Sequence, residues 1–230
     1  GKRLKDAVDT FARSPTKEHR NQVLWLLDEA ANTASKRVYD EAASTGRQGM
    51  TTTVVAGVVG GGAAFIVHVG DSRAYLLRDG QLKQLTEDHS MVNQLLRQGS
   101  ITREEARNSR YRNVITRAVG LYPTVQADTL FVELVDGDRL MLCSDGCSDL
   151  VPEPLMTRLI GDGSVTDATD ALIDASLEAG GKDNVTVIVV EPEAVLEAAA
   201  VAARAKALEN LFLFSDLPFH ARLRVSRIVS

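Results

Sequence analysis

The sequence predicts an α+β fold whose strands are mostly antiparallel. Its apolar pattern passes from helical spacing to strand spacing, through a short helical insertion, and back to strands, helices and a final strand. This order differs from the regular strand–helix alternation of a parallel α/β sheet. Asp79-Gly80 separates two strand-like runs, which is the strongest short-range signal for an antiparallel hairpin.

The expected elements can be placed in chain order. Two helices come first, at residues 3–13 and 20–43, because apolar residues recur there at helical spacing. Strands follow at 51–59, which is rich in β-branched residues, and at 64–69, whose nearly continuous apolar run predicts burial on both faces. The remaining elements are strands 74–78 and 81–85, helices 90–97 and from 102 onward, strands 129–134 and 139–143, helices 152–160 and 167–179, and strand 185–190.

Composition excludes several classes of protein. The 230 residues are 44% hydrophobic and 25% charged, which is typical of a globular chain that buries its own core. A net charge of −5 argues against nucleic acid as a partner, and no apolar run reaches the roughly 18 residues of a membrane span. Two cysteines are too few for a disulfide scaffold, and the first residues lack a signal-peptide core. These features predict a cytoplasmic protein that binds neither nucleic acid nor a membrane.

Three aspartates lie beside predicted strand ends, within Gly70-Asp71-Ser72, Ser144-Asp145-Gly146 and Lys182-Asp183-Asn184. A strand end fixes the direction of a carboxylate, and several carboxylates brought together repel one another unless a cation lies between them. Oxygen ligands of this kind suit Mg²⁺ or Mn²⁺. The alternative is that each aspartate caps a turn, as aspartate commonly does.

Four ordered motifs carry a family resemblance. They are Val69–Tyr75, Leu85–Ser90, Leu142–Gly146 and Gly181–Val187. Together they resemble the metal-dependent protein phosphatases, the type-2C serine/threonine phosphatases, in their bacterial form, over residues 1–191. The resemblance implies a four-layer α-β-β-α sandwich of two mostly antiparallel sheets. It also implies hydrolysis of phosphoserine or phosphothreonine by a metal-bridging water at a binuclear Mg²⁺ or Mn²⁺ site.

The resemblance also implies roles for individual residues. Asp145 and Asp183 match ligands of the core metal pair, and Asp71 together with Asp145 matches the position of a third, weaker ion. Positions that support these ligands without binding the metal directly are Asn184, Gly146 and Ser72. No catalytic residue beyond the metal ligands is assigned.

Residues 88–118 match the family's variable flap. Five arginines lie in the fifteen residues from Arg103 to Arg117, both ends included. They either attract a phosphorylated substrate or form a solvated helical face, and the sequence favours neither. The implied partners are a phosphorylated protein and a serine/threonine kinase or its targets.

The sequence departs from the family before residue 50. The family has an Asn-Glu-Asp strand and an Asp-Gly-x-Gly-Gly loop upstream of its first long helices, which carry two further metal carboxylates, and nothing in residues 1–50 matches them. We expect the chain to be a fragment of a larger regulatory phosphatase that lacks the N-terminal strands, and to be inactive alone. The alternative is a catalytically inactive phosphatase-fold module that binds a kinase or phosphoprotein.

The last residues predict a separate segment. Residues 192–207 are rich in alanine and predict a helical linker, and residues 208–230 predict a terminal helix. Leu208–Pro218 resembles the opening of a cyclic-nucleotide-binding domain, which implies a cyclic nucleotide as a partner of a downstream domain. An amphipathic terminal helix is the equally weighted alternative.

Two histidines and a cysteine are assigned structural roles. His68 lies inside a predicted buried strand and is expected to be a hydrogen-bonded core histidine, and His89 is expected to be structural. Cys143 is expected to behave as a small buried hydrophobe.

Overall fold

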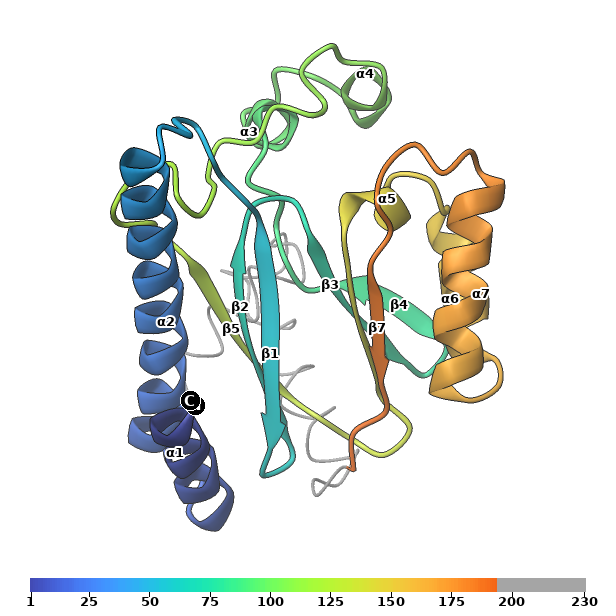
Figure 1. Cartoon of the computed structure of the whole chain (residues 1–230). Helices are drawn as coiled ribbons and strands as arrows, with labels where there is room; N and C mark the ends of the chain where they lie inside the picture. The colour runs from blue at the N-terminus through green and yellow to red at the C-terminus, as the bar shows by residue number, and fades with distance from the viewer. Residues whose placement is uncertain (194–230) are drawn as a thin grey trace.

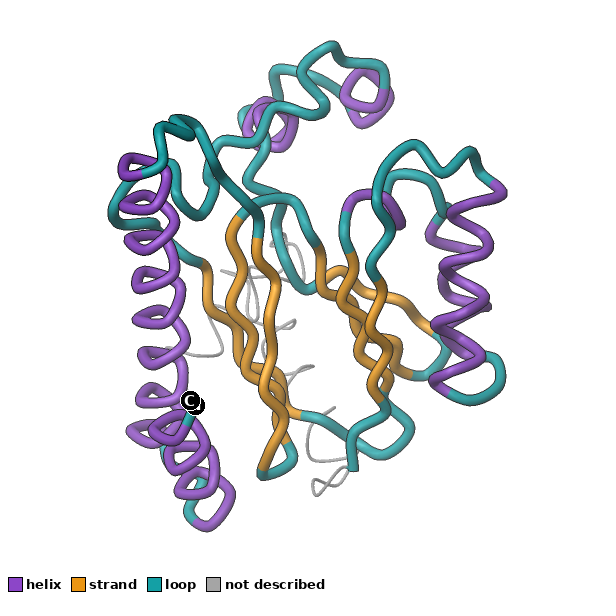
Figure 2. Tube along the Cα trace, viewed as in Figure 1, coloured by secondary structure: helices purple, strands orange, loops and turns teal. Residues whose placement is uncertain are grey.

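The computed structural model describes residues 1–193 and has four layers (Figure 1). Helices α1 (Lys2–Arg13) and α2 (Lys17–Ser44) cover one sheet, a second sheet packs behind it, and α6 (Glu153–Gly161) and α7 (Val165–Glu178) cover the far side (Figures 1 and 2). All strand pairs are antiparallel. The α-β-β-α sandwich is therefore confirmed for the described part of the chain.

The first sheet has the order β1-β2-β5. Its strands are β1 Val54–Gly60, β2 Ala63–Val69 and β5 Asp128–Glu133, and its covering helices are α1 Lys2–Arg13 and α2 Lys17–Ser44. The expected two-sided burial of β2 is confirmed, because all seven of its residues are buried. Three aromatic rings join the helices to the sheet: Phe11 lies edge-on to Phe65 at 5.0 Å and to Phe131 at 5.8 Å.

The second sheet has the order β4-β3-β6-β7. Its strands are β3 Arg73–Arg78, β4 Gln81–Gln84, β6 Arg139–Cys143 and β7 Val187–Val190. The helices beside it are α5 Asp145–Ser148, α6 Glu153–Gly161 and α7 Val165–Glu178. Cys143 is 2% exposed in the core that this sheet forms with α6 and α7, as expected of a small buried hydrophobe.

The inner faces of the two sheets meet in a third apolar cluster, which includes Ile66, Leu76, Leu130 and Leu140. Val55 of the edge strand β1 packs against this cluster, but within the described residues no side chain of the edge strand β7 belongs to it. By register, Val59 shares the inner face with Ala64, and Ile188 and Val190 share it with Leu142 and Leu140. These three edge residues are nevertheless 39%, 50% and 37% exposed. The sandwich of the described residues is therefore open along this side.

The hairpin between β3 and β4 is confirmed. Asp79 and Gly80 both have positive φ values, 50° and 70°, as a two-residue turn of this type requires. The strand expected from residue 51 begins later, at Val54, because Thr52 pairs only with Val119 in an isolated bridge. The short helix α5 was not expected, since four residues are too few to show helical periodicity.

The flap region contains α3 Met91–Arg97 and α4 Arg103–Arg107 (Figure 1). Ser90 caps α3 by accepting a hydrogen bond from the N–H of Asn93. Thr102 and Glu105 form a reciprocal capping box at the start of α4. Each cap satisfies a backbone N–H at the start of its helix. Such local support matters here because helices this short are not stable alone.

A buried ion pair joins β3 to the turn before β6. The carboxylate of Asp138 is 0% exposed and accepts two hydrogen bonds from Arg78, at 2.8 and 2.6 Å. Asp138 also accepts the N–H of Val135 at 2.9 Å, and Arg78 donates to the carbonyl of Glu133. Because each charge has several partners, the pair stabilises the far end of the sandwich rather than leaving a charge unsatisfied.

No helix within residues 1–193 is long and apolar enough to cross a membrane. The linker helix, the terminal helix and the cyclic-nucleotide-domain resemblance fall on residues that lie almost wholly outside the described part of the chain.

Candidate metal centre

Neighbouring strands of the second sheet bring the three predicted aspartates to one edge. Asp71 comes two residues before β3, Asp145 two residues after β6, and Asp183 four residues before β7. Arg73 pairs with Cys143, and Cys143 pairs with Val187, so these strand ends lie side by side. The three aspartates therefore share the end of the sheet that lies beneath the flap (Figure 1).

The loop that carries Asp183 packs directly on the loop that carries Asp145. The Ser144 hydroxyl donates to the carbonyl of Asn184 at 3.2 Å and accepts the N–H of Thr186 at 3.1 Å. A Cβ atom on Gly146 would lie 2.5 Å from the Asn184 carbonyl oxygen, which is too close for any side chain. Gly146 and Asn184 thus allow the two acidic loops to approach each other through their backbones.

A different glycine positions Asp71. Gly70 has a φ of +111°, and a Cβ there would lie 2.4 Å from Cγ2 of Thr53. The hydroxyls of Thr53 and Ser72 lie 2.8 Å apart in a hydrogen bond. The Asp71 loop is therefore held against the entry to β1 on both sides of the aspartate, and Ser72 takes part in holding it through Thr53.

The carboxylates at this edge influence one another. Burial raises the pKa of Asp71 above its usual range, and the negative charges of Asp145 and Asp88 raise it further. Asp183 is exposed, and its carboxylate accepts the N–H of Asn184 at 2.7 Å. Asp71 and Asp145 are thus close enough to repel each other, while Asp183 lies in the adjacent loop.

Asp149 belongs to the same group, although the sequence analysis did not include it. Burial raises the pKa of Asp149, the Arg73 guanidinium opposes that shift, and the charges of Asp145 and Asp88 add to it. Asp149 lies one helical turn after Asp145, at the end of α5. That i, i+4 spacing was the available signal, but it is informative only if α5 is recognised.

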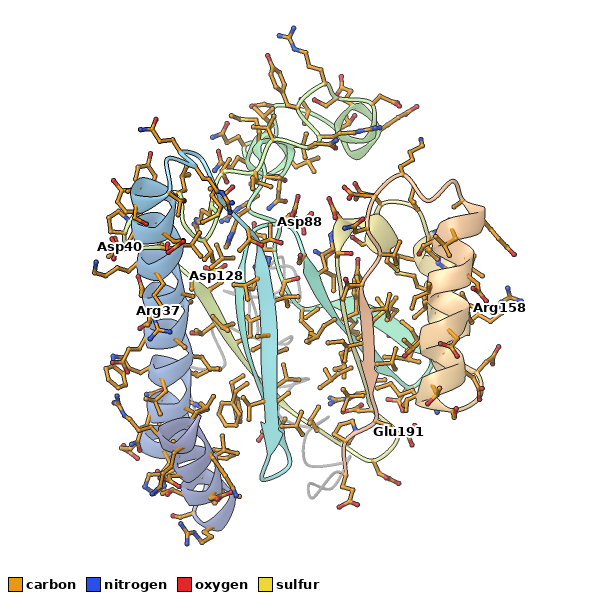
Figure 3. The ribbon with its side chains drawn as sticks, in the orientation of Figure 1. Arg37, Asp40, Asp88, Asp128, Arg158 and Glu191 are labelled. Atoms are coloured by element: carbon orange, nitrogen blue, oxygen red, sulfur yellow. The ribbon has the colours of Figure 1, made fainter. Side chains whose placement is uncertain are left out.

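Arg73 connects this edge to the start of the flap. Its guanidinium donates to both carboxylate oxygens of Asp88, at 2.6 to 3.1 Å, and to the hydroxyl of Tyr75. Asp88 also accepts a hydrogen bond from Gln84 at 3.1 Å. Figure 3 shows Asp88 and Asp128 at this end of the sheets and Glu191 at the opposite end. The flap therefore begins from a rigid ion pair.

Comparison with known proteins identifies the family. A sequence model of the family described as "Protein phosphatase 2C" matches residues 2–161. The chain belongs to the protein phosphatase 2C family. "Serine/threonine phosphatase stp" of Listeria welshimeri is 39% identical over 168 residues, which are 73% of this chain and 67% of that protein. "Serine/threonine protein phosphatase PstP" of Mycobacterium tuberculosis is 41% identical over 144 residues, which are 63% of this chain and 28% of that protein.

Solved structures agree with this assignment. "Serine/threonine phosphatase Stp1 from Staphylococcus aureus" has a TM-score of 0.71 at 35% identity, covering 75% of this chain and 69% of that one. "The catalytic domain of serine threonine protein phosphatase PstP in complex with 2 Manganese ions" has a TM-score of 0.67 at 37% identity, covering 72% and 70%. The chain spans about 57% to 67% of the length of the Listeria phosphatases it matches.

The donor set of this phosphatase 2C chain suits a hard divalent cation in type but is incomplete in number. Carboxylate oxygens are the ligands that Mg²⁺ and Mn²⁺ prefer, and the mutual repulsion of Asp71 and Asp145 favours a cation between them. Within residues 1–193, however, no three His, Cys, Asp or Glu side chains are grouped so that they could hold a metal ion.

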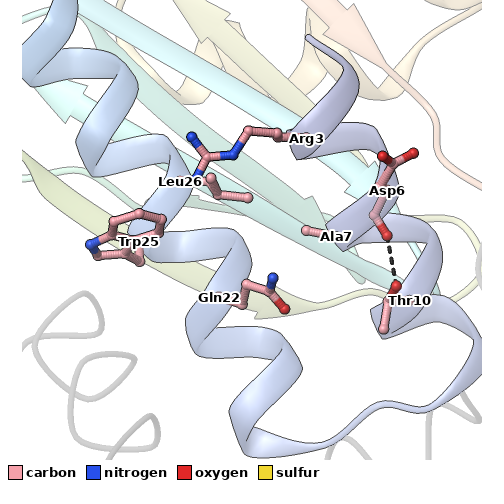
Figure 4. A pocket seen from close by; sticks show the side chains of 7 residues that line it. All are labelled: Arg3, Asp6, Ala7, Thr10, Gln22, Trp25 and Leu26. Atoms are coloured by element: carbon pink, nitrogen blue, oxygen red, sulfur yellow. Dashed lines mark hydrogen bonds between the residues drawn. The ribbon is translucent and has the colours of Figure 1, made fainter.

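A pocket of about 240 Å³ lies far from these carboxylates, between α1 and α2. Figure 4 shows its lining, in which Arg3 lies near the ring of Trp25 and the Thr10 hydroxyl donates to the backbone carbonyl of Asp6. Asp6 is its one acidic lining residue, so this pocket does not have the ligands of a metal centre.

His68 is buried as expected, but the expectation that it is hydrogen-bonded is wrong. Its side chain is 0% exposed, and neither ring nitrogen has a hydrogen-bond partner among the described residues. Its ring stacks on that of His89, with centroids 4.7 Å apart. Burial, followed by the charge of His89, lowers the pKa of His68 from 6.5 to about 4.

This shift predicts a pH dependence of stability. Between pH 4 and 6.5 the folded chain binds fewer protons at His68 than the unfolded chain, so stability present above pH 6.5 falls as the pH decreases. One such group contributes a slope of at most about 1.4 kcal/mol per pH unit. We expect His68→Phe to flatten the dependence of the unfolding free energy, measured by urea denaturation, across this window. Above pH 7 the unfolding free energies of the two proteins should depend on pH in the same way. Equal slopes between pH 4 and 6.5 would contradict the lowered pKa of His68.

Proposed function

We propose that this chain contributes Asp71, Asp145 and Asp183 to a binuclear Mg²⁺ or Mn²⁺ centre that hydrolyses phosphoserine and phosphothreonine in proteins. Asp145 and Asp183 are proposed ligands of the metal pair, and Asp71, with Asp145, of a third ion. The observation that supports the proposal is that these aspartates lie beside neighbouring strand ends at one edge of the β3-β6-β7 sheet. The named relatives are serine/threonine phosphatases, one of them in complex with two manganese ions.

Each part of the site has a distinct task in this reaction. Mg²⁺ or Mn²⁺ ions held by these aspartates would supply an activated water for attack on phosphorus and would neutralise charge on the phosphoryl oxygens. Asp145 is held at the start of α5, where its carboxylate accepts the N–H of Gly146 at 2.9 Å. Gly146 and Asn184 keep the loops of Asp145 and Asp183 in contact. Ser72 holds the Asp71 loop through Thr53.

We further propose that the chain is part of a longer phosphatase in which other strands complete the sandwich. Val59, Ile188 and Val190 support this, because they face the space between the sheets yet remain exposed at the edge strands. Strands added to β1 and β7 would bury these side chains. The same strands could supply the carboxylates that the described residues lack, which accords with the family's acidic N-terminal motifs.

The proposed substrate is a phosphorylated protein, and the proposed partners are a serine/threonine kinase or its targets. The flap lies above the carboxylate edge, where a phosphorylated segment would enter (Figure 1). Exposed flap arginines, Arg110 and Arg112, provide positive charge there.

A second candidate function is a catalytically inactive module that binds a kinase or phosphoprotein. It is favoured by one observation: residues 1–193 hold no group of three metal-ligating side chains. A phosphatase fold without enough ligands would retain the flap and the carboxylate edge as a binding surface but could not activate water.

Turnover of a phosphothreonine peptide with and without Mn²⁺ distinguishes the two functions. We expect little activity from the 230-residue chain alone and Mn²⁺-dependent, EDTA-sensitive activity from the longer protein. Robust turnover by the chain alone would show that the described carboxylates suffice and would contradict the proposed need for further ligands. A longer protein with no Mn²⁺-dependent turnover would favour the inactive module.

A further inference from the structure

The loop before Asp71 is hydrogen-bonded to one side chain outside the carboxylate group. The N–H of Gly70 donates to Nδ1 of His89 at 3.1 Å, and the N–H of His89 donates to the carbonyl of Gly70 at 2.7 Å. Gly70 immediately precedes Asp71 and has the left-handed φ of +111° described above. These two hydrogen bonds therefore determine the direction in which the chain enters Asp71.

The opposite nitrogen of His89 defines the protonation of the ring. Nε2 lies 3.3 Å from the Asp128 carboxylate. Because Nδ1 must be unprotonated to accept the Gly70 N–H, the neutral ring carries its proton on Nε2, where the Asp128 carboxylate is an adjacent acceptor. Nη1 of Arg117 lies 3.1 Å from Nε2 and 3.3 Å from the other Asp128 oxygen. Because a guanidinium only donates and a protonated Nε2 cannot accept, Arg117 donates to the carboxylate when the ring carries its proton on Nε2.

Packing fixes the plane of the His89 ring. The side chain is 6% exposed and lies against the ring of His68 at an interplanar angle of 38°. His68 belongs to β2, whose residues are all buried, so it offers a rigid surface. The ring of His89 therefore has little freedom to leave the Gly70 N–H.

The backbone of His89 also holds the two ends of the flap together. Its carbonyl accepts the N–H of Thr116 at 2.7 Å, and the adjacent Ser90 forms a bridge with Ile115. The N–H of Met91 donates to the carbonyl of Val114 at 2.8 Å. One residue thus touches the start of the flap, the end of the flap and the Asp71 loop.

We propose that His89 is a positioning residue that couples the conformation of the flap to the direction of the Asp71 carboxylate. The inference rests on the proposed metal-binding role of Asp71. A displacement of either flap end moves the His89 backbone, and the ring transmits that movement to Gly70 through the Nδ1 hydrogen bond. A protein segment bound at the flap would in this way change the affinity of the Asp71 position for a metal ion.

Two substitutions of His89 distinguish the role of Nδ1 from that of Nε2. The side-chain oxygen of His89→Asn occupies nearly the position of Nδ1 and can still accept the Gly70 N–H, whereas that of His89→Gln extends to the position of Nε2. We expect amide hydrogen exchange at Gly70, measured by NMR on the metal-free 230-residue chain, to be about tenfold faster in His89→Gln. In His89→Asn it should stay close to that of the parent.

The direction of Asp71 provides a second readout on the same samples. We expect its χ1 couplings to report one rotamer in the parent and in His89→Asn, and averaging in His89→Gln. A merely structural role would weaken both variants alike. Equal Gly70 exchange in the two variants, or an Asp71 rotamer indifferent to both, would overturn the proposal.

Asn93→Ala is a matched control, because it loosens the start of the flap without removing a contact to Gly70. Asn93 donates to the Asp88 carbonyl at 2.8 Å and to the Glu87 carboxylate at 3.2 Å. We expect Asn93→Ala to leave Gly70 protected. Fast exchange at Gly70 in this variant would show that any loosening of the flap exposes the loop, which would contradict a specific role of His89.

The parent chain tests the proposal even if a His89 variant fails to fold. Long-range ¹⁵N NMR correlations distinguish the two histidine tautomers, and we expect His89 with Nε2 protonated and Nδ1 free. Protonation of Nδ1 in the neutral ring would overturn the proposal. None of these measurements uses metal or substrate, so a result that overturns the role of His89 says nothing against the proposed phosphatase activity. Conversely, a protein that is inactive but has a protected Gly70 would contradict the proposed activity and not the role of His89.

Discussion

Asp145→Asn in the proposed longer phosphatase should reduce turnover of a phosphothreonine peptide by about three orders of magnitude. Asparagine keeps the shape of the side chain but removes the negative charge that the proposed cations require. Metal-assisted charge stabilisation is worth several kcal/mol in the transition state, and each ~1.4 kcal/mol is about tenfold in rate. The measurement is the steady-state rate at saturating Mn²⁺, accompanied by calorimetric titration of Mn²⁺. Asp183→Asn should behave similarly.

The control for this experiment is Asp170→Asn, an exposed position on α7 away from the carboxylate edge. It removes the same charge from the surface and should leave the rate unchanged. Removal of the Asp145 charge should also lower the pKa of Asp71, because that charge is one cause of its increase. Near-normal turnover in Asp145→Asn or Asp183→Asn would exclude that residue from the metal centre.

Asp138→Ala should cost about 3–5 kcal/mol of unfolding free energy, the range observed when one partner of a buried ion pair is removed. The replacement leaves the Arg78 guanidinium without its carboxylate at 2.6 Å and the Val135 N–H without its acceptor. Urea denaturation of the 230-residue chain, with the midpoint and slope fitted separately, measures the loss.

Two further variants test the cause of that loss. Glu191→Gln removes a partly exposed partner of Arg139 and should cost only about 0–1 kcal/mol. Arg78→Met in the Asp138→Ala background should recover part of the stability, because it removes the uncompensated charge. If Asp138→Ala costs no more than Glu191→Gln, burial of the pair contributes nothing measurable.

Local patterns in the sequence were sufficient to predict much of the architecture. The turn at Asp79-Gly80 requires two residues that accept positive φ, so the sequence itself specifies the hairpin. The apolar run over residues 63–69 is buried on both faces because it forms the middle strand of its sheet. The three motif aspartates lie beside strand ends, as predicted, but their roles as metal ligands came from the family resemblance and stay a prediction. Strand ends were less accurate, since the pairing of Thr52 with Val119 depends on residues far apart in the chain.

The tertiary structure alone revealed the interactions that cross between loops. Asp149 joins the carboxylates because α5 brings it back toward Asp145, and the repulsion between them exists only after the chain has folded. His68 lacks the hydrogen bonds expected of it because the packing of the two sheets places His89, rather than an acceptor, against its ring. Periodicity and turn chemistry act over a few residues, so they specify elements. Charge, burial and hydrogen bonding between distant segments depend on how those elements pack, and they determine the proposed centre.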